Sequence, residues 1–273
     1  MLAMDPRPVG VFDSGVGGLT VLHECLVTMP NEDFVYLGDH ARLPYGPRPL
    51  DEIRRFAFEI AGFLEARDVK LIVVACNTAS AVALPVLTAA LSPVPVIGVV
   101  EPGARAAIAA TQNGRIAVIA TEGTVRGGAY LRAIHALRPE AKVEQKACPL
   151  FVALAEEGWT EGDVPERAAE IYLSHLFGRA DSPDTLVLGC THFPLLADAI
   201  AHAAGGAVLV DSAETTAAEV AQLLETRGLR RVGAEEPAIF LATDAAERFA
   251  RVGSGFLGRT IETAQVEIVD LAP

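Results

Sequence analysis

Short apolar runs recur along the chain, and most are followed by a polar or glycine-containing turn and then by a stretch with helical spacing. Near-continuous Val, Ile and Leu runs are typical of strands buried on both faces, and their alternation with helices predicts an α/β fold with doubly wound parallel sheets. The predicted strands are Val9–Asp13, Phe34–Gly38, Leu71–Ala75, Val96–Val100, Ile116–Ala120, Lys142–Ala147, Leu186–Gly189, Ala207–Val210 and Ala238–Ala242. The predicted helices include Leu50–Ala66, Ala79–Ala90, Glu101–Ala110, Val125–Leu137, Pro165–Phe177, Pro194–Ala203 and Ala213–Arg227.

One strand-and-turn pattern occurs twice. Leu-Ile-Val-Val-Ala-Cys-Asn-Thr at 71–78 is matched by Thr-Leu-Val-Leu-Gly-Cys-Thr-His at 185–192. The repetition predicts two similar α/β domains, one discontinuous domain of residues 1–100 and 212–273 and a second of residues 101–211. Ligands bind at the carboxyl ends of parallel strands in such folds, so we expect the active site in the cleft between the domains.

The composition narrows the classes of partner. The chain has 22 basic and 35 acidic residues, and its net charge of −13 disfavours nucleic acid as a partner. Residues 71–100 contain no charged side chain, but their polar residues and prolines indicate a buried strand–helix–strand segment rather than a membrane span. The N-terminus has no secretory signal pattern and the four cysteines form no CxxC pair, so we expect free thiols in a reducing cytoplasm.

A glycine-rich turn, Phe-Asp-Ser-Gly-Val-Gly-Gly-Leu-Thr at 12–20, follows the first predicted strand and opens a helix. It is neither a dinucleotide loop, because Thr20 occupies the position of the third glycine, nor a P-loop, because no GK[ST] is present. Two interpretations stay open. The turn is either a plain strand-to-helix connection or a cradle for a small anion, with Asp13 at its lip.

The two cysteine motifs, ACNTAS at 75–80 and GCTHFP at 189–194, each place a thiol between a strand and a helix. A helix N-terminus lowers the pKa of a thiol, and His192 is close enough in sequence to assist proton movement at Cys190. The alternative is a buried cysteine followed by a helix cap, such as Asn77 or Thr78. Cys190 and His192 do not supply the four ligands of a zinc site, so no metal is expected.

Two such thiols facing one cleft suit racemisation of a carbon acid. One thiolate removes the α-proton from one face of the substrate, and the other thiol delivers a proton to the opposite face. A pyridoxal enzyme would instead need a Schiff-base lysine. The three lysines, Lys70, Lys142 and Lys146, lie before or along predicted strands rather than after them, so we expect no cofactor.

Taken together, these motifs resemble those of bacterial glutamate racemases, of the cofactor-independent aspartate/glutamate racemase superfamily. The matching stretches are FDSGVGGL at 12–19, LGD at 37–39, PYG at 44–46, ACNTAS at 75–80, ACPLFV at 147–152 with Glu156, and GCTHFPLL at 189–196.

The resemblance implies an amino-acid racemase that forms D-glutamate for peptidoglycan and acts as a homodimer. Cys76 would act on the D-enantiomer and Cys190 on the L-enantiomer, assisted by Asp13 and His192. Asp39 and Glu156 would tune the site. The substrate would be held by Ser14, Tyr45, Gly46, Asn77, Thr78, Thr121, Thr124 and Thr191.

Two other functions stay open on the sequence. One is an aspartate or hydantoin racemase of the same superfamily, although the PYG segment and the DSGVGGL loop favour glutamate. The other is an amino-acid-binding regulator without catalysis, which the presence of both thiols with Asp13 and His192 argues against.

Overall fold

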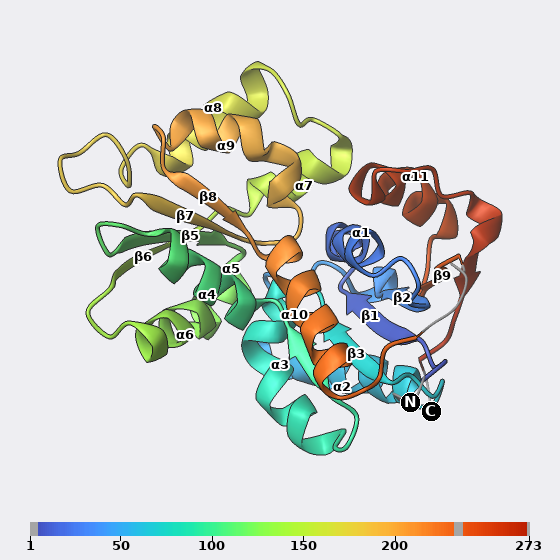
Figure 1. The fold of residues 1–273 in the computed structure, drawn as a ribbon. Helices are drawn as coiled ribbons and strands as arrows, with labels where there is room; N and C mark the ends of the chain where they lie inside the picture. Colours follow the sequence, from blue (N-terminus) through green and yellow to red (C-terminus); the bar gives the residue numbers. More distant parts are fainter. Residues whose placement is uncertain (1–4, 232–236, 272–273) are drawn as a thin grey trace.

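The structure, a computed structural model, describes residues 5–231 and 237–271, and within them two separate parallel sheets (Figure 1). The larger sheet has the order β10-β9-β2-β1-β3-β4, and the smaller has the order β6-β5-β7-β8. The strands are β1 (Val9–Asp13), β2 (Phe34–Gly38), β3 (Leu71–Val74), β4 (Val96–Gly98), β5 (Arg115–Ala120), β6 (Lys142–Ala147), β7 (Thr185–Gly189), β8 (Val208–Asp211), β9 (Ile239–Ala242) and β10 (Val266–Ile268).

The two sheets repeat one topology. In the larger sheet the first four strands run in the order β2-β1-β3-β4, and in the smaller sheet β5 to β8 run in the equivalent order β6-β5-β7-β8. All of these neighbours pair in parallel. The prediction of two similar doubly wound α/β units is therefore confirmed.

This order determines where ligands bind. From β1 the chain first adds β2 on one side of that strand and then adds β3 on its other side. This reversal opens a crevice beyond the carboxyl ends of β1 and β3. The same holds for β5 and β7. Cys76 follows β3 and Cys190 follows β7, so each thiol lies at the crevice of its own sheet.

The helices cover both faces of the sheets. They are α1 (Leu19–Thr28), α2 (Leu50–Glu65), α3 (Asn77–Ala90), α4 (Val100–Ala110), α5 (Glu122–Gly127), α6 (Ala129–Leu137), α7 (Leu150–Glu157), α8 (Asp163–Leu173), α9 (Ala197–Ala203), α10 (Ser212–Thr226) and α11 (Ala246–Leu257), with short 3-10 turns at η1 (His40–Arg42), η2 (Phe193–Leu196) and η3 (Thr263–Gln265). Helix α10 packs against both α1 and α4, and so joins the two halves of the molecule (Figure 1).

Four of the predicted helices differ from the structure by two or more residues. The helix predicted over Pro165–Phe177 is α8, which begins at Asp163 and ends at Leu173. The single helix predicted over Val125–Leu137 is two helices, because Gly128 adopts a left-handed conformation at φ 63° and ends α5. The helix predicted from Pro194 begins as the 3-10 turn η2. At α3 the cap is Cys76 itself, whose sulfur accepts a hydrogen bond from the Ala79 N–H, and Asn77 and Thr78 lie inside the helix.

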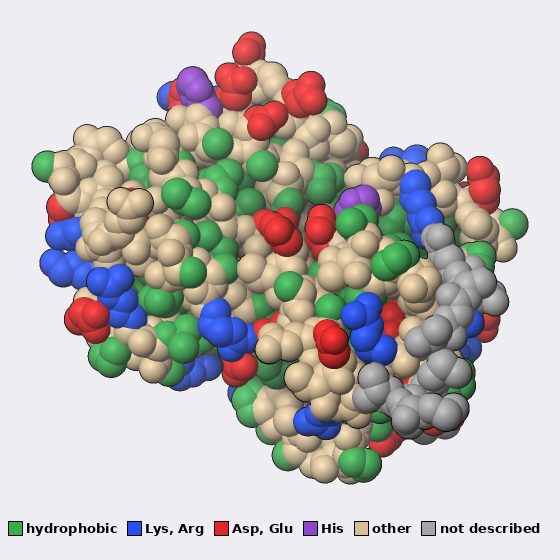
Figure 2. All heavy atoms as spheres, viewed as in Figure 1, with side chains coloured by type: hydrophobic (Ala, Val, Ile, Leu, Met, Phe, Trp, Pro, Cys, Tyr) green, Lys and Arg blue, Asp and Glu red, His purple; other side chains and the backbone are tan. Residues whose placement is uncertain are grey.

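The uncharged run 71–100 forms β3, α3, β4 and the first residue of α4, as a strand–helix–strand core segment. Across the described ranges, 5–231 and 237–271, no helix combines the length and the apolar character needed to cross a membrane. The charge imbalance is visible on the surface, where acidic side chains gather over the α8 end of the smaller sheet (Figure 2).

Lys70 has a structural role. Its Nζ lies 2.5 Å from Oε2 of Glu32 and donates to the carbonyl of Asp5 at 2.9 Å. Both charged side chains are almost fully buried. Glu32 also accepts from the backbone N–H of Arg231. The ammonium is therefore fixed inside the protein, before β3, and is not free to form a Schiff base.

Candidate active site

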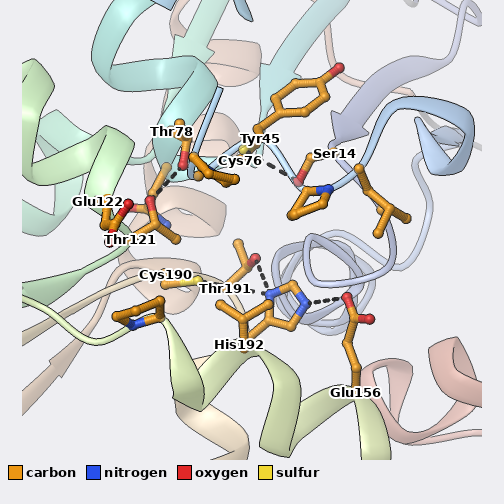
Figure 3. A pocket seen from close by; sticks show the side chains of 18 of the residues that line it. Ser14, Tyr45, Cys76, Thr78, Thr121, Glu122, Glu156, Cys190, Thr191 and His192 are labelled. Carbon is orange, nitrogen blue, oxygen red and sulfur yellow. Dashed lines mark hydrogen bonds and ion pairs between the residues drawn. The ribbon is translucent and has the colours of Figure 1, made fainter. Parts of the chain in front are cut away.

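A cavity of about 490 Å³ lies between the two sheets, at the carboxyl ends of β1, β3, β5 and β7. Cys76 and Cys190 lie on facing walls (Figure 3). Eleven of the residues predicted from the sequence line this cavity: Ser14, Tyr45, Gly46, Cys76, Asn77, Thr78, Thr121, Glu156, Cys190, Thr191 and His192.

Cys76 lies at the end of β3, in a buried position beside Ser14. Its sulfur lies 3.7 Å from Oγ of Ser14 and 3.5 Å from the backbone nitrogen of Ala79. Burial and, as a smaller cause, the charge of the Asp13 carboxylate together raise the pKa of the Cys76 thiol to about 12. The Ala79 N–H at the helix N-terminus lowers this pKa as expected, but the cost of burying a thiolate is larger, so the expected net lowering of the pKa is wrong.

Asp13 lies behind the wall of the cavity. Its side chain is buried, Oδ1 accepts from the Gly15 N–H at 3.0 Å, and Oδ2 has no hydrogen-bond partner among the described residues. Burial raises the pKa of Asp13, while the positive charge of His192 opposes that rise. Oδ2 is therefore the atom on which this carboxyl group can hold a proton near Cys76.

Cys190 belongs to a chain of polar contacts. Its sulfur lies 3.8 Å from Nδ1 of His192, and Nε2 of that ring lies 3.2 Å from Oε1 of Glu156 (Figure 3). Burial acts to lower the pKa of His192, but the hydrogen bonds to Cys190 and Glu156 outweigh it and raise that pKa to about 10. This direction favours the imidazolium form of the ring, in which the nitrogen that faces Cys190 carries a proton.

Glu156 is the anionic partner of this ring. Its other oxygen, Oε2, accepts from Nη2 of Arg248 at 2.7 Å. Burial acts to raise the pKa of Glu156, but His192 and Arg248 lower it to about 2.

The pair predicts a pH-dependent stability. The raised pKa of His192 stabilises the fold fully below pH 6.5, and this stabilisation is lost as the pH rises toward 10. The lowered pKa of Glu156 stabilises the fold fully above pH 4.5, and this stabilisation is lost as the pH falls toward 2. Glu156→Gln is therefore expected to lower the free energy of unfolding most between pH 4.5 and 6.5 and progressively less at higher pH, measured by urea unfolding.

The matched control is Glu157→Gln, an exposed carboxylate on the same helix. A stability difference for Glu156→Gln that stays constant from pH 5 to pH 9 would contradict the assigned ion pair.

Hydroxyl groups form the wall next to Cys76. Oγ1 of Thr78 lies 2.9 Å from Oγ1 of Thr121 and 3.2 Å from Oγ1 of Thr124. Asn77 accepts a hydrogen bond from the Tyr130 hydroxyl at 2.7 Å, which orients its amide, and its Nδ2 is buried without a partner among the described residues. These are neutral groups with hydrogen-bonding capacity left for a ligand.

Three predicted residues lie one layer behind the cavity: Asp13, Asp39 and Thr124. The Asp39 carboxylate accepts hydrogen bonds from the Tyr45 hydroxyl, from Nε of Arg42 at 2.7 Å and from Oγ1 of Thr243 at 3.0 Å. Asp39 therefore fixes Tyr45, which lines the cavity.

The sequence did not single out every residue of the site. Glu122, Val152 and Ala153 also line the cavity, and Glu122 follows directly after the predicted Thr121. Arg248 was missed because its helix, α11, was not predicted at all.

The cavity contains no lysine or arginine among the described residues that line it, and its charged side chains are Glu122, Glu156 and the protonated His192. An acidic ligand must therefore be held by hydroxyls, the Asn77 amide and backbone N–H groups. The described residues contain no group of three or more His, Cys, Asp or Glu side chains arranged to bind a metal ion.

Comparison with known proteins identifies the family. The sequence profile of the Asp/Glu/Hydantoin racemase family matches residues 21–220. The glutamate racemase of Geobacter metallireducens is 52% identical over 254 residues, which cover 92% of this chain and 93% of that protein. The chain therefore belongs to the Asp/Glu/Hydantoin racemase family.

Solved structures agree with this assignment. The glutamate racemase of Francisella tularensis in complex with D-glutamate is 36% identical, with a TM-score of 0.91 and coverage of 98% of both chains. The glutamate racemase of Thermus thermophilus in complex with beta-chloro-D-alanine is 47% identical, with a TM-score of 0.88 and the same coverage.

Proposed function

We propose that this chain is a cofactor-independent glutamate racemase that interconverts L- and D-glutamate and supplies D-glutamate for peptidoglycan. The observation that carries the proposal is the placement of two buried thiols, Cys76 and Cys190, on facing walls of one cavity and at equivalent strand ends. The relatives named as glutamate racemases, which align over nearly the whole chain, support glutamate as the substrate.

In the L-to-D direction, Cys190 as a thiolate takes the α-proton of L-glutamate, and the electron pair of the C–H bond stays on Cα. Cys76 as a thiol then delivers its proton to the opposite face. The products are D-glutamate, a Cys76 thiolate and a Cys190 thiol, and the D-to-L direction exchanges the roles. Burial, which holds Cys76 in the thiol form, and the imidazolium beside Cys190 both support this starting state.

The neighbours of each thiol act on its proton. His192 holds a proton on Nδ1, next to Cys190, and Asp13 is the corresponding carboxyl group on the Cys76 side. The α-proton of an amino acid is far less acidic than a thiol, so the developing charge must be stabilised by fixed donors in a water-poor cavity. Asn77 Nδ2 and the Thr78–Thr121 hydroxyl pair are suited to hold the carboxylates.

The two enzymatic alternatives are separated by turnover on L-glutamate, L-aspartate and hydantoins under one set of conditions. Turnover on L-glutamate alone, or far above the others, is expected. A regulator without catalysis would bind glutamate but leave the circular dichroism signal of L-glutamate unchanged over time.

The deciding experiment follows the α-proton of glutamate in D₂O with purified protein and no added cofactor. Because the proton delivered to Cα comes from a thiol that exchanges with solvent, the product enantiomer is expected to carry deuterium at Cα. The measurement is ¹H NMR of the α-proton combined with chiral chromatography.

An inactive protein that becomes active on addition of pyridoxal phosphate would overturn the proposal. So would formation of D-glutamate that retains the original α-hydrogen throughout, since two facing bases cannot retain it completely.

Three further proposals concern the whole molecule. We divide the chain into a discontinuous domain of residues 1–100 and 212–273 and a domain of residues 101–211, which the membership of the two sheets supports. We also propose a homodimer, from the family resemblance, and a cytoplasmic location, which the four free cysteines support. Light scattering at micromolar concentration tests the dimer.

A further inference from the structure

Helix α11 reaches across from the larger sheet to the Cys190 side of the cavity. It lies in the chain between β9 and β10, whereas Glu156 belongs to α7 beside the smaller sheet (Figure 1). The contact between Arg248 Nη2 and Glu156 Oε2, at 2.7 Å, therefore joins the two halves of the molecule. Arg248 itself does not line the cavity in the described structure.

The same helix contacts His192 a second time. The Phe256 ring packs edge-on against the imidazole, with ring centroids 5.0 Å apart and an interplanar angle of 72°. Arg248, Val252 and Phe256 are spaced four residues apart, which puts them on one face of α11. That face fixes both the ring of His192 and the carboxylate to which the ring is hydrogen-bonded.

We propose that Arg248 is a positioning residue for proton transfer at Cys190. Its ion pair fixes Glu156, Glu156 fixes the His192 ring through Nε2, and the ring then presents Nδ1 to the Cys190 sulfur 3.8 Å away. This inference rests on the proposed two-thiol racemisation. It means that proton transfer at Cys190 depends on Arg248, a residue from the opposite domain.

The arrangement is in direct contact with one thiol only, Cys190. Cys76 has its own neighbours, Ser14 and Asp13, which come from the first strand and its turn. Loss of Arg248 is therefore expected to slow proton transfer at Cys190 and leave transfer at Cys76 unchanged.

Two enantiomers have equal free energy, so any variant must lower kcat/KM equally in the two directions. The asymmetry appears instead in the primary isotope effect with α-deuterated substrates. When transfer at Cys190 slows, removal of deuterium from L-glutamate becomes more rate-limiting and its isotope effect rises. Removal from D-glutamate, which Cys76 performs, becomes less rate-limiting, and its isotope effect falls toward one.

The test compares Arg248→Met with Arg251→Met. Arg251 is an exposed arginine on the same helix, so its replacement removes the same charge from α11 without touching Glu156. Arg248→Met is expected to lower kcat/KM by about fivefold, because a half-exposed ion pair contributes modestly. Arg251→Met is expected to keep the activity and both isotope effects of the parent protein, and Arg248→Lys to restore part of the loss.

Ser14→Ala is the mirror variant, since Ser14 contacts Cys76. It is expected to raise the isotope effect with D-glutamate and lower it with L-glutamate. Arg248→Met loses one partly exposed ion pair, so its melting temperature is expected to lie only slightly below that of Arg251→Met.

Unchanged kcat/KM in Arg248→Met, or isotope effects that move equally for both enantiomers, would overturn the positioning role. Either result would leave the proposed function intact, provided that the parent protein racemises glutamate and that Cys190→Ala does not. A parent protein that does not racemise glutamate would instead remove the proposed function itself.

Discussion

Alanine at either Cys76 or Cys190 is expected to lower kcat/KM for glutamate racemisation by about 10⁴-fold, the upper range for loss of a general acid or base. The two thiols lie on facing walls of the cavity, and each serves one face of Cα. Without one of them, a proton can be removed from one face but not delivered to the other. The measurement is the rate of change of circular dichroism with L- and D-glutamate as separate substrates.

The matched control is Cys25→Ala. Cys25 is a fully buried thiol in α1, outside the cavity. Its replacement is expected to reduce the free energy of unfolding by about 1 kcal/mol, the usual cost of a small deletion in a core, and to leave kcat/KM unchanged. Normal turnover by the Cys76→Ala, Cys190→Ala double variant would disprove the two-thiol mechanism.

Gly17→Ala is expected to lower kcat/KM by about 100-fold, because misplacement of catalytic groups by about 1 Å has effects of this size. A Cβ at residue 17 would overlap Oγ1 of Thr191 and lie only 2.5 Å from Nδ1 of His192. Nδ1 is the atom that faces Cys190, so the substitution would push the ring away from the thiol.

Gly62→Ala provides the control for this substitution. Gly62 lies inside α2, and a Cβ there would meet no atom within 4 Å. Alanine is expected to stabilise the helix by about 1 kcal/mol, because it is the better helix former, and to leave activity unchanged. Full activity in Gly17→Ala would show that the loop and His192 can separate without consequence for catalysis.

The sequence predicted the strands and the cysteine motifs well, for a physical reason. Buried parallel strands need continuous apolar residues, and β1, β2 and β6 have the predicted bounds. The repeated motif at 71–78 and 185–192 indicated two similar sheets, and the structure brings Cys76 and Cys190 to one cavity. Local patterns were enough because each thiol is placed by the strand directly before it.

Features that depend on contacts between distant segments were not predicted. Helix α11 alternates charged and apolar residues near the end of the chain, and nothing local connects Arg248 to Glu156. The glycine turn was interpreted as a tight connection or an anion cradle. The structure adds another requirement at Gly17, which is close contact with Thr191 and His192, the residues that follow β7 of the smaller sheet. The pKa of Cys76 also depends on burial by the whole fold.

The absence of lysine and arginine from the described lining of the cavity has a consequence for how the protein selects its substrate. Among the described residues, no lysine or arginine lines the cavity, so the two carboxylates of the substrate are recognised by hydrogen bonds and shape rather than by lysine or arginine side chains. Sites built on exposed cations attract any small anion and weaken as salt rises. Other small anions therefore meet no lysine or arginine on the described walls of this cavity, and salt has no such contact there to screen.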